Sequence, residues 1–276
     1  MGIIDRLFGR KNGPAQPVRD VAELVAPLST RAVQLLKCAD ATRSYFGGSP
    51  SLPEAAAWPS KAGKPLTFLA SLDLESLSQT LPVPWLPSSG RLLFFYDVDN
   101  QPWGFDPKDR GSWAVIFERA QATSSDLPAV ARGLPQHYVS FQTISTYPSG
   151  ERPEVAALGL NDAESDAFID LGSSAYGDFP CHQVGGFPSL VQGDDMELEC
   201  QLASNGVYCG EPAAYRDPET ARLREGAEDW KLLLQVDSDD DLEVMWGDAG
   251  VLYFWIREQD ARAGRFDNTW VVLQCY

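Results

Sequence analysis

Histidine is scarce in this sequence, which contains only two, His137 and His182, among 276 residues. Its five cysteines are scattered, and no two of them form a C-x-x-C pair. Zinc sites usually need such paired ligands, and nucleophilic catalysis usually needs a histidine held beside a nucleophile. Cys181 does precede His182, but neighbouring side chains along a strand point apart. The sequence therefore predicts no metal, no cofactor and no catalytic residue, and it indicates reduced thiols.

Glycine loops that hold phosphates are also missing. The sequence contains neither G-x-G-x-x-G nor G-x-x-x-x-G-K-[ST], in which backbone N–H groups bind a nucleotide. No apolar run is long enough to cross a membrane, and no signal-peptide pattern is present. These absences argue against the common nucleotide-binding classes and predict a cytoplasmic protein.

Basic residues are rare in the second half of the chain. Residues 1–138 carry 13 acidic and 14 basic side chains, whereas residues 139–276 carry 26 acidic and 8 basic ones. The net charge of −17 thus arises wholly in the second half. Such a field repels nucleic acid and anionic lipid and attracts basic proteins. We expect a basic protein partner and no direct nucleic-acid binding, although an acidic surface can also serve solubility alone.

The first 18 residues differ from the rest of the chain. Their apolar residues fall on one helical face and are Ile3, Ile4, Leu7 and Phe8. Three basic residues lie among and after them, Arg6, Arg10 and Lys11. Residues 1–12 either bind a membrane weakly as an amphipathic helix or form a frayed terminus. We expect residues 1–18 to be a tail and residues 19–276 to be one domain.

A six-residue pattern, GG-x-P-S-L, occurs twice, in GGSPSLPE from Gly47 and in GGFPSLVQ from Gly185. Each copy is followed by an apolar strand ending in aspartate, FLASLD or LLLQVD, and then by a glycine with an aromatic strand, GRLLFFY or GVLYFWI. This preserved order indicates an internal duplication, with pseudo-repeats at about residues 31–120 and 180–276. Glycine permits positive φ and proline fixes the exit direction. The expected structural corners are therefore Gly47, Gly48, Pro50, Gly185, Gly186 and Pro188.

The fold class follows from the mixture of elements. Strands are expected at residues 31–38, 66–72, 91–98, 113–117, 138–147, 196–203, 231–236, 251–256 and 269–275. Helices are expected at residues 20–27, 73–81, 161–171 and 212–230. Strands and helices do not alternate regularly, which indicates an α+β fold. We expect two similar β-rich lobes packed into one compact unit with peripheral helices.

The run DSDDDLEVMWGD is the strongest candidate for a site. Its carboxylates are Asp237, Asp239, Asp240, Asp241, Glu243 and Asp248. Five of them match the spacing of a calcium loop, but Leu242 replaces the required glycine and the flanks are typical of strands. The run is otherwise a polar turn between buried strands, or an anionic patch that binds a partner. Carboxylates that can extend such a patch are Asp194, Asp195, Glu197 and Glu199.

Several segments together resemble the YwqG-like family, a bacterial domain of unknown function. The segments are GGSPSLPEAAAWP, FLASLDL, SSGRLLFFYD, GGFPSLVQ, LLLQVDSDDDLEVMWGDAGVLYFWI and WVVLQCY, which span nearly the whole chain after the tail. Ser71 departs from the glutamine usual in the family, whereas Gln235 keeps it in the second copy. The resemblance implies a compact α+β fold and no assigned reaction. Some relatives are similar to immunity proteins encoded beside interbacterial toxins.

Three hypotheses about function follow. The first is a non-enzymatic acidic binding protein, most concretely an immunity protein that occludes the active or nucleic-acid-binding site of a basic toxin such as a nuclease. The second is an enzyme or small-ligand binder with carboxylates and aromatic residues between the lobes. The third is a peripheral membrane scaffold attached through residues 1–12.

Overall fold

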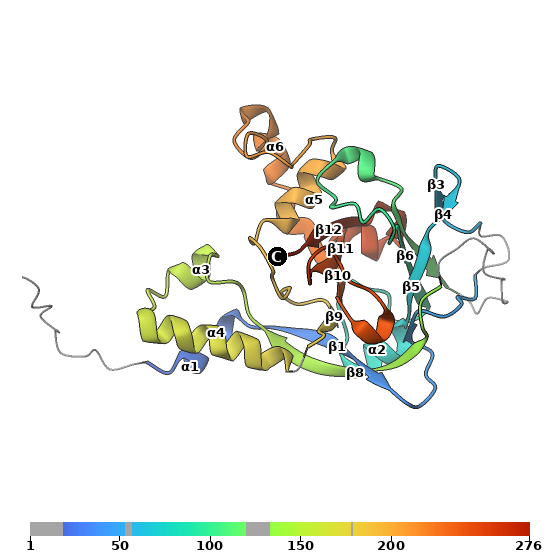
Figure 1. The fold of residues 1–276 in the computed structure, drawn as a ribbon. Helices are drawn as coiled ribbons and strands as arrows, with labels where there is room; N and C mark the ends of the chain where they lie inside the picture. The colour runs from blue at the N-terminus through green and yellow to red at the C-terminus, as the bar shows by residue number, and fades with distance from the viewer. Residues whose placement is uncertain (1–18, 53–56, 120–132, 178) are drawn as a thin grey trace, which may run out of the picture.

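A ten-stranded sheet dominates the computed structural model, which describes residues 19–52, 57–119, 133–177 and 179–276 (Figure 1). Every neighbouring pair of strands is antiparallel. From one edge to the other, the strands are β12 (Trp270–Gln274), β11 (Val251–Arg257), β10 (Trp230–Asp237), β9 (His182–Val184), β1 (Thr30–Cys38), β8 (His137–Thr146), β2 (Tyr45–Phe46), β5 (Thr67–Asp73), β6 (Arg91–Tyr96) and β7 (Trp113–Glu118). A small separate hairpin consists of β3 (Ser60–Lys61) and β4 (Lys64–Pro65).

The helices are short, apart from one. They are α1 (Val21–Val25), α2 (Leu74–Thr80), α3 (Pro153–Ala156), α4 (Asp162–Tyr176), α5 (Met196–Ser204), α6 (Ala221–Arg224) and α7 (Glu258–Arg262). The 3-10 turns are η1 (Ala26–Leu28), η2 (Pro107–Asp109), η3 (Pro218–Thr220), η4 (Ala227–Asp229), η5 (Asp240–Leu242) and η6 (Phe266–Asn268). Within the part of the chain that the structure describes, no helix is both long and apolar enough to cross a membrane.

Side-chain caps set the starts of three helices. Asp20 accepts a hydrogen bond from the backbone N–H of Glu23, and Asp73 accepts one from Ser76. Asn161 and Glu164 form a reciprocal capping box at the start of α4. Each cap satisfies a backbone donor that has no partner within its helix. The predicted starts of these helices are therefore confirmed, and α4 extends to Tyr176.

The sheet curls into a nearly closed barrel. Its edge strands β7 and β12 meet through side chains, because the Trp113 indole N–H donates to the Thr269 carbonyl over 2.9 Å. The loop before β7 also reaches β12, where the Leu273 N–H donates to the Trp103 carbonyl over 3.1 Å. The Trp270 indole N–H donates to Gly104 over 2.8 Å. These bonds close the gap that backbone pairing leaves open.

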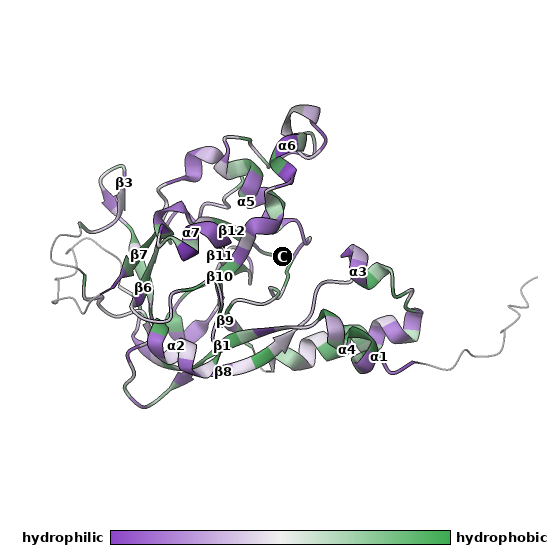
Figure 2. Ribbon diagram, turned by 180° about the vertical axis from the view of Figure 1, so that it is seen from behind, coloured by the Kyte–Doolittle hydropathy of each residue, from purple (hydrophilic) through white to green (hydrophobic). Residues whose placement is uncertain are grey.

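The main hydrophobic core includes aromatic residues from both halves of the chain. Phe94 and Phe254 are fully buried, with ring centroids 5.3 Å apart. A smaller cluster that includes Phe68 and Phe95 packs under Trp58. Figure 2 shows mostly hydrophilic residues over the α6 segment, which projects from the barrel. The aromatic strands thus serve the core, as their apolar sequences predict.

In the described part of the chain, strands from both halves join one ten-stranded sheet, and two separate lobes are not present. The central pair β1 and β8 runs in register over nine residues, from Thr30 opposite Thr146 to Cys38 opposite Tyr138. Strand β9 then adds to β1 and strand β2 adds to β8. The expectation of two β-rich lobes is therefore corrected, since the strands of the two halves pair directly across the centre.

Two predicted elements are wrong. Residues 196–203, expected as a strand, form helix α5, which buries Met196 and Cys200. Residues 212–230, expected as one helix, contain only short turns around α6. For residues 196–203, packing of a helix face on the barrel produced the apolar pattern that was taken for a strand.

The GG-x-P-S-L segments form corresponding corners after β2 and β9. Gly47 and Gly185 both have positive φ, of 60° and 70°, and their N–H groups donate to Leu69 and Leu232. The following residues, Gly48 and Gly186, have φ values of 70° and 69°. The prolines of the two segments, Pro50 and Pro188, are buried. Each corner therefore directs the chain away from the sheet at the same place relative to its neighbouring strand.

Candidate functional site

The acidic loop, residues 237–249, connects β10 to β11 and folds tightly upon itself. Asp239 caps η5 by accepting a hydrogen bond from the Asp241 N–H, and it pairs with Val244 in an isolated bridge. Trp246 is 1% exposed and packs edge-on against Tyr96, with ring centroids 5.6 Å apart. This buried anchor fixes the backbone on which the carboxylates stand.

Two carboxylates of the run point inward. Asp237 accepts a hydrogen bond from the Cys181 N–H over 2.8 Å, and burial raises the pKa of its carboxyl above the ordinary value. Asp239 lies 2.8 Å from the Lys37 ammonium and 3.2 Å from the His182 ring. Burial opposes its ionisation, but the hydrogen bonds from His182 and Lys37 prevail and hold the pKa of Asp239 far below its usual range. Both residues therefore act inside the fold.

His182 links the backbone of Asp237 to the carboxylate of Asp239. Its Nδ1 accepts the Asp237 N–H over 3.1 Å, so the ring proton resides on Nε2 and is donated to Asp239. The ring is 1% exposed and packs 4.7 Å from the Phe46 centroid. Burial, aided by the charge of Asp237, raises the pKa of the adjacent Cys181 thiol to about 12. A thiolate nucleophile is therefore strongly disfavoured at this position.

The remaining carboxylates of the acidic loop face solvent. These exposed residues are Asp240, Asp241, Glu243 and Asp248. Asp241 also forms an ion pair with Lys37, although its side chain remains 64% exposed. Its carbonyl oxygen lies 3.0 Å from Nε2 of His137 on β8. The run is thus divided into an inner pair that holds the loop and an outer set that is exposed to solvent.

Beside this loop lies a surface depression of about 690 Å³, here named the acidic hollow. Four aspartates line it, Asp237, Asp239, Asp240 and Asp241. Lys37 is the single basic side chain among its described lining residues. The hollow therefore keeps an excess of negative charge even after Lys37 has paired with its two neighbours.

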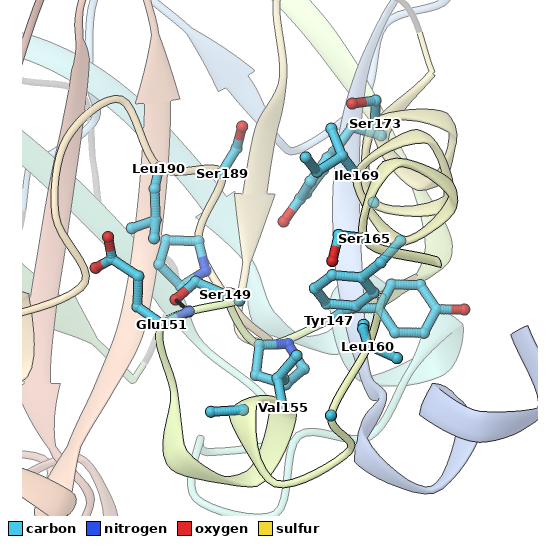
Figure 3. Close-up of a pocket in the computed structure, with 18 of the residues that line it drawn as sticks. Tyr147, Ser149, Glu151, Val155, Leu160, Ser165, Ile169, Ser173, Ser189 and Leu190 are labelled. Atoms are coloured by element: carbon cyan, nitrogen blue, oxygen red, sulfur yellow. Dashed lines mark hydrogen bonds between the residues drawn. The ribbon is translucent and has the colours of Figure 1, made fainter. Parts of the chain in front are cut away.

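An apolar groove of about 610 Å³ adjoins the acidic hollow (Figure 3). Helix α4 forms one wall, and the segments around residues 147–151 and 188–190 form the others. Ser173, Phe179, Ser189 and Leu190 line both depressions. In Figure 3, Ile169 and Ser173 project from α4 on the side of Ser189 and Leu190. The two depressions consequently form one extended surface with an apolar and an acidic part.

A comparison with known proteins places the chain in a family. A model described as "Domain of unknown function (DUF1963)" matches residues 44–275. The chain belongs to the DUF1963 family. No curated protein matches the chain. The matched region of the DUF1963 domain contains both glycine corners and the whole acidic loop, but it begins after β1, which supplies Lys37 to that loop.

A second group of carboxylates in the DUF1963 domain lies elsewhere. The Arg152 guanidinium binds Asp194 through two contacts of 2.5 and 2.8 Å and binds Glu197 over 2.6 Å. With exposed Asp195, these residues line a separate hollow of about 620 Å³. None of its lining residues lines the acidic hollow. The structure therefore does not bring Asp194, Asp195 and Glu197 together with the acidic loop at one site.

Sequence reasoning missed the role of Lys37 and the helical, buried setting of Glu199. Lys37 lies 202 positions from Asp239, and no local pattern signals such a pairing. Glu199 lies on α5, where burial raises the pKa of its carboxyl to about 7 despite a hydrogen bond from the Tyr215 hydroxyl over 3.2 Å. Recognising residues 196–203 as a helix would have indicated this burial, because Glu199 is then next to the buried Cys200 on a helix packed against the core.

The positions of the carboxylates in the acidic loop do not match those of a calcium loop. Among the described residues, no three histidine, cysteine, aspartate or glutamate side chains come together as ligands for a metal ion. Within the acidic loop, Asp237 and Asp239 turn inward, whereas Asp248 is exposed. Calcium needs six to eight oxygen ligands around one point, and this divergence does not provide them.

Proposed function

We propose that this DUF1963 chain is a non-enzymatic binding protein that receives a basic segment of a partner protein at its acidic loop. One observation carries the proposal: exposed carboxylates stand on a loop whose backbone is fixed by Asp239 and Trp246. A fixed array of like charges loses little conformational freedom on binding, so complementary charges strengthen and accelerate association.

The narrower form of the proposal is an immunity protein for a basic bacterial toxin such as a nuclease. Carboxylates of the acidic loop then take the places of nucleic-acid phosphates in the toxin's groove. The support is the acidic second half of the chain together with the YwqG-like resemblance of its motifs. Occlusion of this kind needs no catalytic residue in the inhibitor.

The test reverses charges without disturbing Lys37. Purified products of the genes adjacent to its own are tested for binding to the unaltered protein and to an Asp240→Lys/Asp248→Lys variant. Since both residues are exposed, the variant should fold, and its association rate should fall at least about tenfold at low salt. The matched control is Glu211→Lys/Glu225→Lys, which makes the same charge change on exposed positions around α6.

Three results count against this function. Equal loss of binding in both variants indicates a general field effect without a site at the acidic loop. If no neighbouring product binds the unaltered protein, the immunity form fails. A product that binds both variants as tightly as the unaltered protein excludes the acidic loop as the contact surface.

A second candidate is binding of a neutral small ligand at the hollow beside Arg152. Three tryptophans contribute to its lining, Trp85, Trp230 and Trp255. Aromatic faces with nearby carboxylates suit sugars, which present both apolar C–H faces and hydroxyls. Titration with neutral mono- and disaccharides tests this candidate, and a Trp85→Ala variant should lose the binding heat. The absence of heat with every sugar rejects it.

We also infer that the sheet arose by internal duplication. The strand order is symmetrical about the β1–β8 pair, so β5 and β6 occupy places that correspond to β10 and β11. Both β5 and β10 contain a register shift, between Phe68 and Ala70 and between Leu232 and Leu234. These correspondences support duplication of one unit within a shared sheet. The acidic loop exists in only one copy, so the proposed contact site is single.

A further inference from the structure

The apolar groove leaves large hydrophobic side chains uncovered. Ile169 is 64% exposed and Phe179 is 68% exposed, and both line the groove. Beneath them the surface is also apolar, since Phe168 and Tyr176 contribute buried rings to it. Adjacent exposed apolar side chains around a concavity mark a binding surface more often than an ordinary protein face.

The start of the described chain lies at one end of this groove. Arg19 is held there by Glu164, which accepts hydrogen bonds from the Arg19 backbone N–H, Nε and Nη2 over 3.0, 2.9 and 2.7 Å. Two further guanidinium bonds go to the carbonyl oxygens of Leu158 and Gly159, over 3.1 and 3.2 Å. Gly159 and Leu160 line the groove. The described part of the chain therefore begins next to the groove.

The chemistry of the preceding residues matches the groove. Residues 1–18 lie outside the described part of the chain, and their sequence places Ile3, Ile4, Leu7 and Phe8 at helical spacing. They include three basic side chains and one acidic one. Helix α4, which forms a wall of the groove, carries four acidic side chains and no basic one. Of these four, Glu164 already pairs with Arg19 and Asp170 lines a separate depression, so the exposed Asp162 and Asp166 remain to complement the basic side chains.

The available length is sufficient. Seven residues, 12–18, separate Lys11 from Arg19 and span up to about 24 Å when extended. The fifteen residues of α4 rise about 22 Å from end to end. The length of the linker therefore allows the apolar segment to reach any position along the groove, including the start of α4, where Asp162 and Asp166 are exposed.

We propose that residues 3–11 dock in the apolar groove of their own chain, with Leu7 and Phe8 packed beside Ile169. The occupant is then supplied by the protein itself, in the helix-in-groove manner. This inference is independent of the proposed function, because it concerns the protein without any partner. It also assigns the basic residues of the segment to α4 instead of a lipid surface.

The experiment uses a labelled peptide with the sequence of residues 1–12 and measures its fluorescence anisotropy with full-length chains. In the unaltered chain the tethered segment competes, whereas Leu7→Asp/Phe8→Asp releases the groove. Because a short linker gives millimolar effective concentrations, the peptide should bind the released variant about tenfold more tightly. Adding Ile169→Asp should abolish that binding, and adding Tyr208→Asp, at a residue 50% exposed on another surface, should not.

Hydrogen exchange provides a second readout on the same proteins. Amides of residues 147–151 and 168–176 should exchange faster in the Leu7→Asp/Phe8→Asp variant than in the unaltered chain. Equal exchange, or equal peptide binding by both chains, overturns the proposal. If the groove amides of the unaltered chain are protected from exchange only at high protein concentration, the segment of a second copy occupies the groove. Binding of anionic vesicles that is lost in the variant, without any change in exchange, assigns the segment to a membrane.

Discussion

Lys37 and Asp239 lie 202 positions apart in the sequence, and the Lys37 ammonium is 2.8 Å from both carboxylate oxygens of Asp239. Lys37 stands near the end of the central strand β1, and Asp239 starts the turn of the acidic loop. The ion pair therefore connects the middle of the sheet to the candidate site. Because Asp239 is 5% exposed, its charge depends on this partner and on His182.

Replacing Lys37 should destabilise the whole fold. Lys37→Met removes the cation from the buried Asp239 carboxylate and leaves it only the hydrogen bonds from His182 and the Asp241 N–H, which should lower the free energy of unfolding by about 2 kcal/mol. The midpoint of urea unfolding at pH 7 measures the change. Lys64→Met, on an exposed residue of the β3–β4 hairpin, is the control and should shift the midpoint little. Equal midpoints for both variants contradict the assigned role of the pair.

Stability should depend on pH through Glu199. Its pKa is raised to about 7 in the folded protein, mainly by burial, so the unfolded chain releases this proton at lower pH than the folded one. Ionisation therefore reduces stability as pH rises from about 4.5 to 7, and the loss is complete above 7. Glu199→Gln removes this dependence and should gain about 2 kcal/mol relative to the unaltered chain between pH 4.5 and 8. Thermal unfolding across this range measures it, and a constant difference contradicts the assignment.

The two glycines of the corner after β9 allow the cost of backbone strain to be measured separately from the cost of a steric clash. A Cβ at Gly185 meets no atom within 4 Å, whereas one at Gly186 lies 2.5 Å from Thr146 Oγ1 and 2.7 Å from Ala32 Cβ. Gly185→Ala should cost about 1 kcal/mol for its positive φ alone. Gly186→Ala should cost clearly more, since β1 and β8 must also move. Chemical denaturation of the two variants measures the difference, and equal costs refute the steric explanation.

Closure of the barrel can be tested at Trp113. Trp113→Phe keeps an aromatic ring against Trp270, whose centroid is 4.9 Å away, but it removes the indole donor to Thr269. The buried Thr269 carbonyl then lacks this partner, which should cost about 1–2 kcal/mol. Amide exchange should increase in β7 and β12 more than in β1 and β8. If amide exchange becomes equally faster in all four strands, the Trp113 bond does not act locally at the junction of β7 and β12.

Much of the fold could be predicted from the sequence. Strands β6, β10 and β11 are apolar runs bounded by turn residues, and the helix starts at Asp73 and Asn161 follow from capping chemistry. The α+β class is confirmed. The strand expected at residues 196–203 was wrong, because tertiary packing on the barrel outweighed local β-propensity.

The candidate site was only partly predictable. The sequence identified the acidic loop, but it could not show that Asp237 and Asp239 turn inward while Asp240 remains exposed. That division depends on His182 and Lys37, which approach from other strands. Likewise, the distance of Asp194 from the loop is set by its pairing with Arg152, which no spacing along the chain reveals.

The position of β1 has a practical consequence for how the family region is handled. The match begins at residue 44, whereas β1 ends at Cys38 and hydrogen bonds to β8 on one side and β9 on the other. A polypeptide trimmed to the matched residues loses this strand and exposes two unpaired strand edges in the middle of the sheet. Such edges pair with those of other molecules, so we expect aggregation from the trimmed chain.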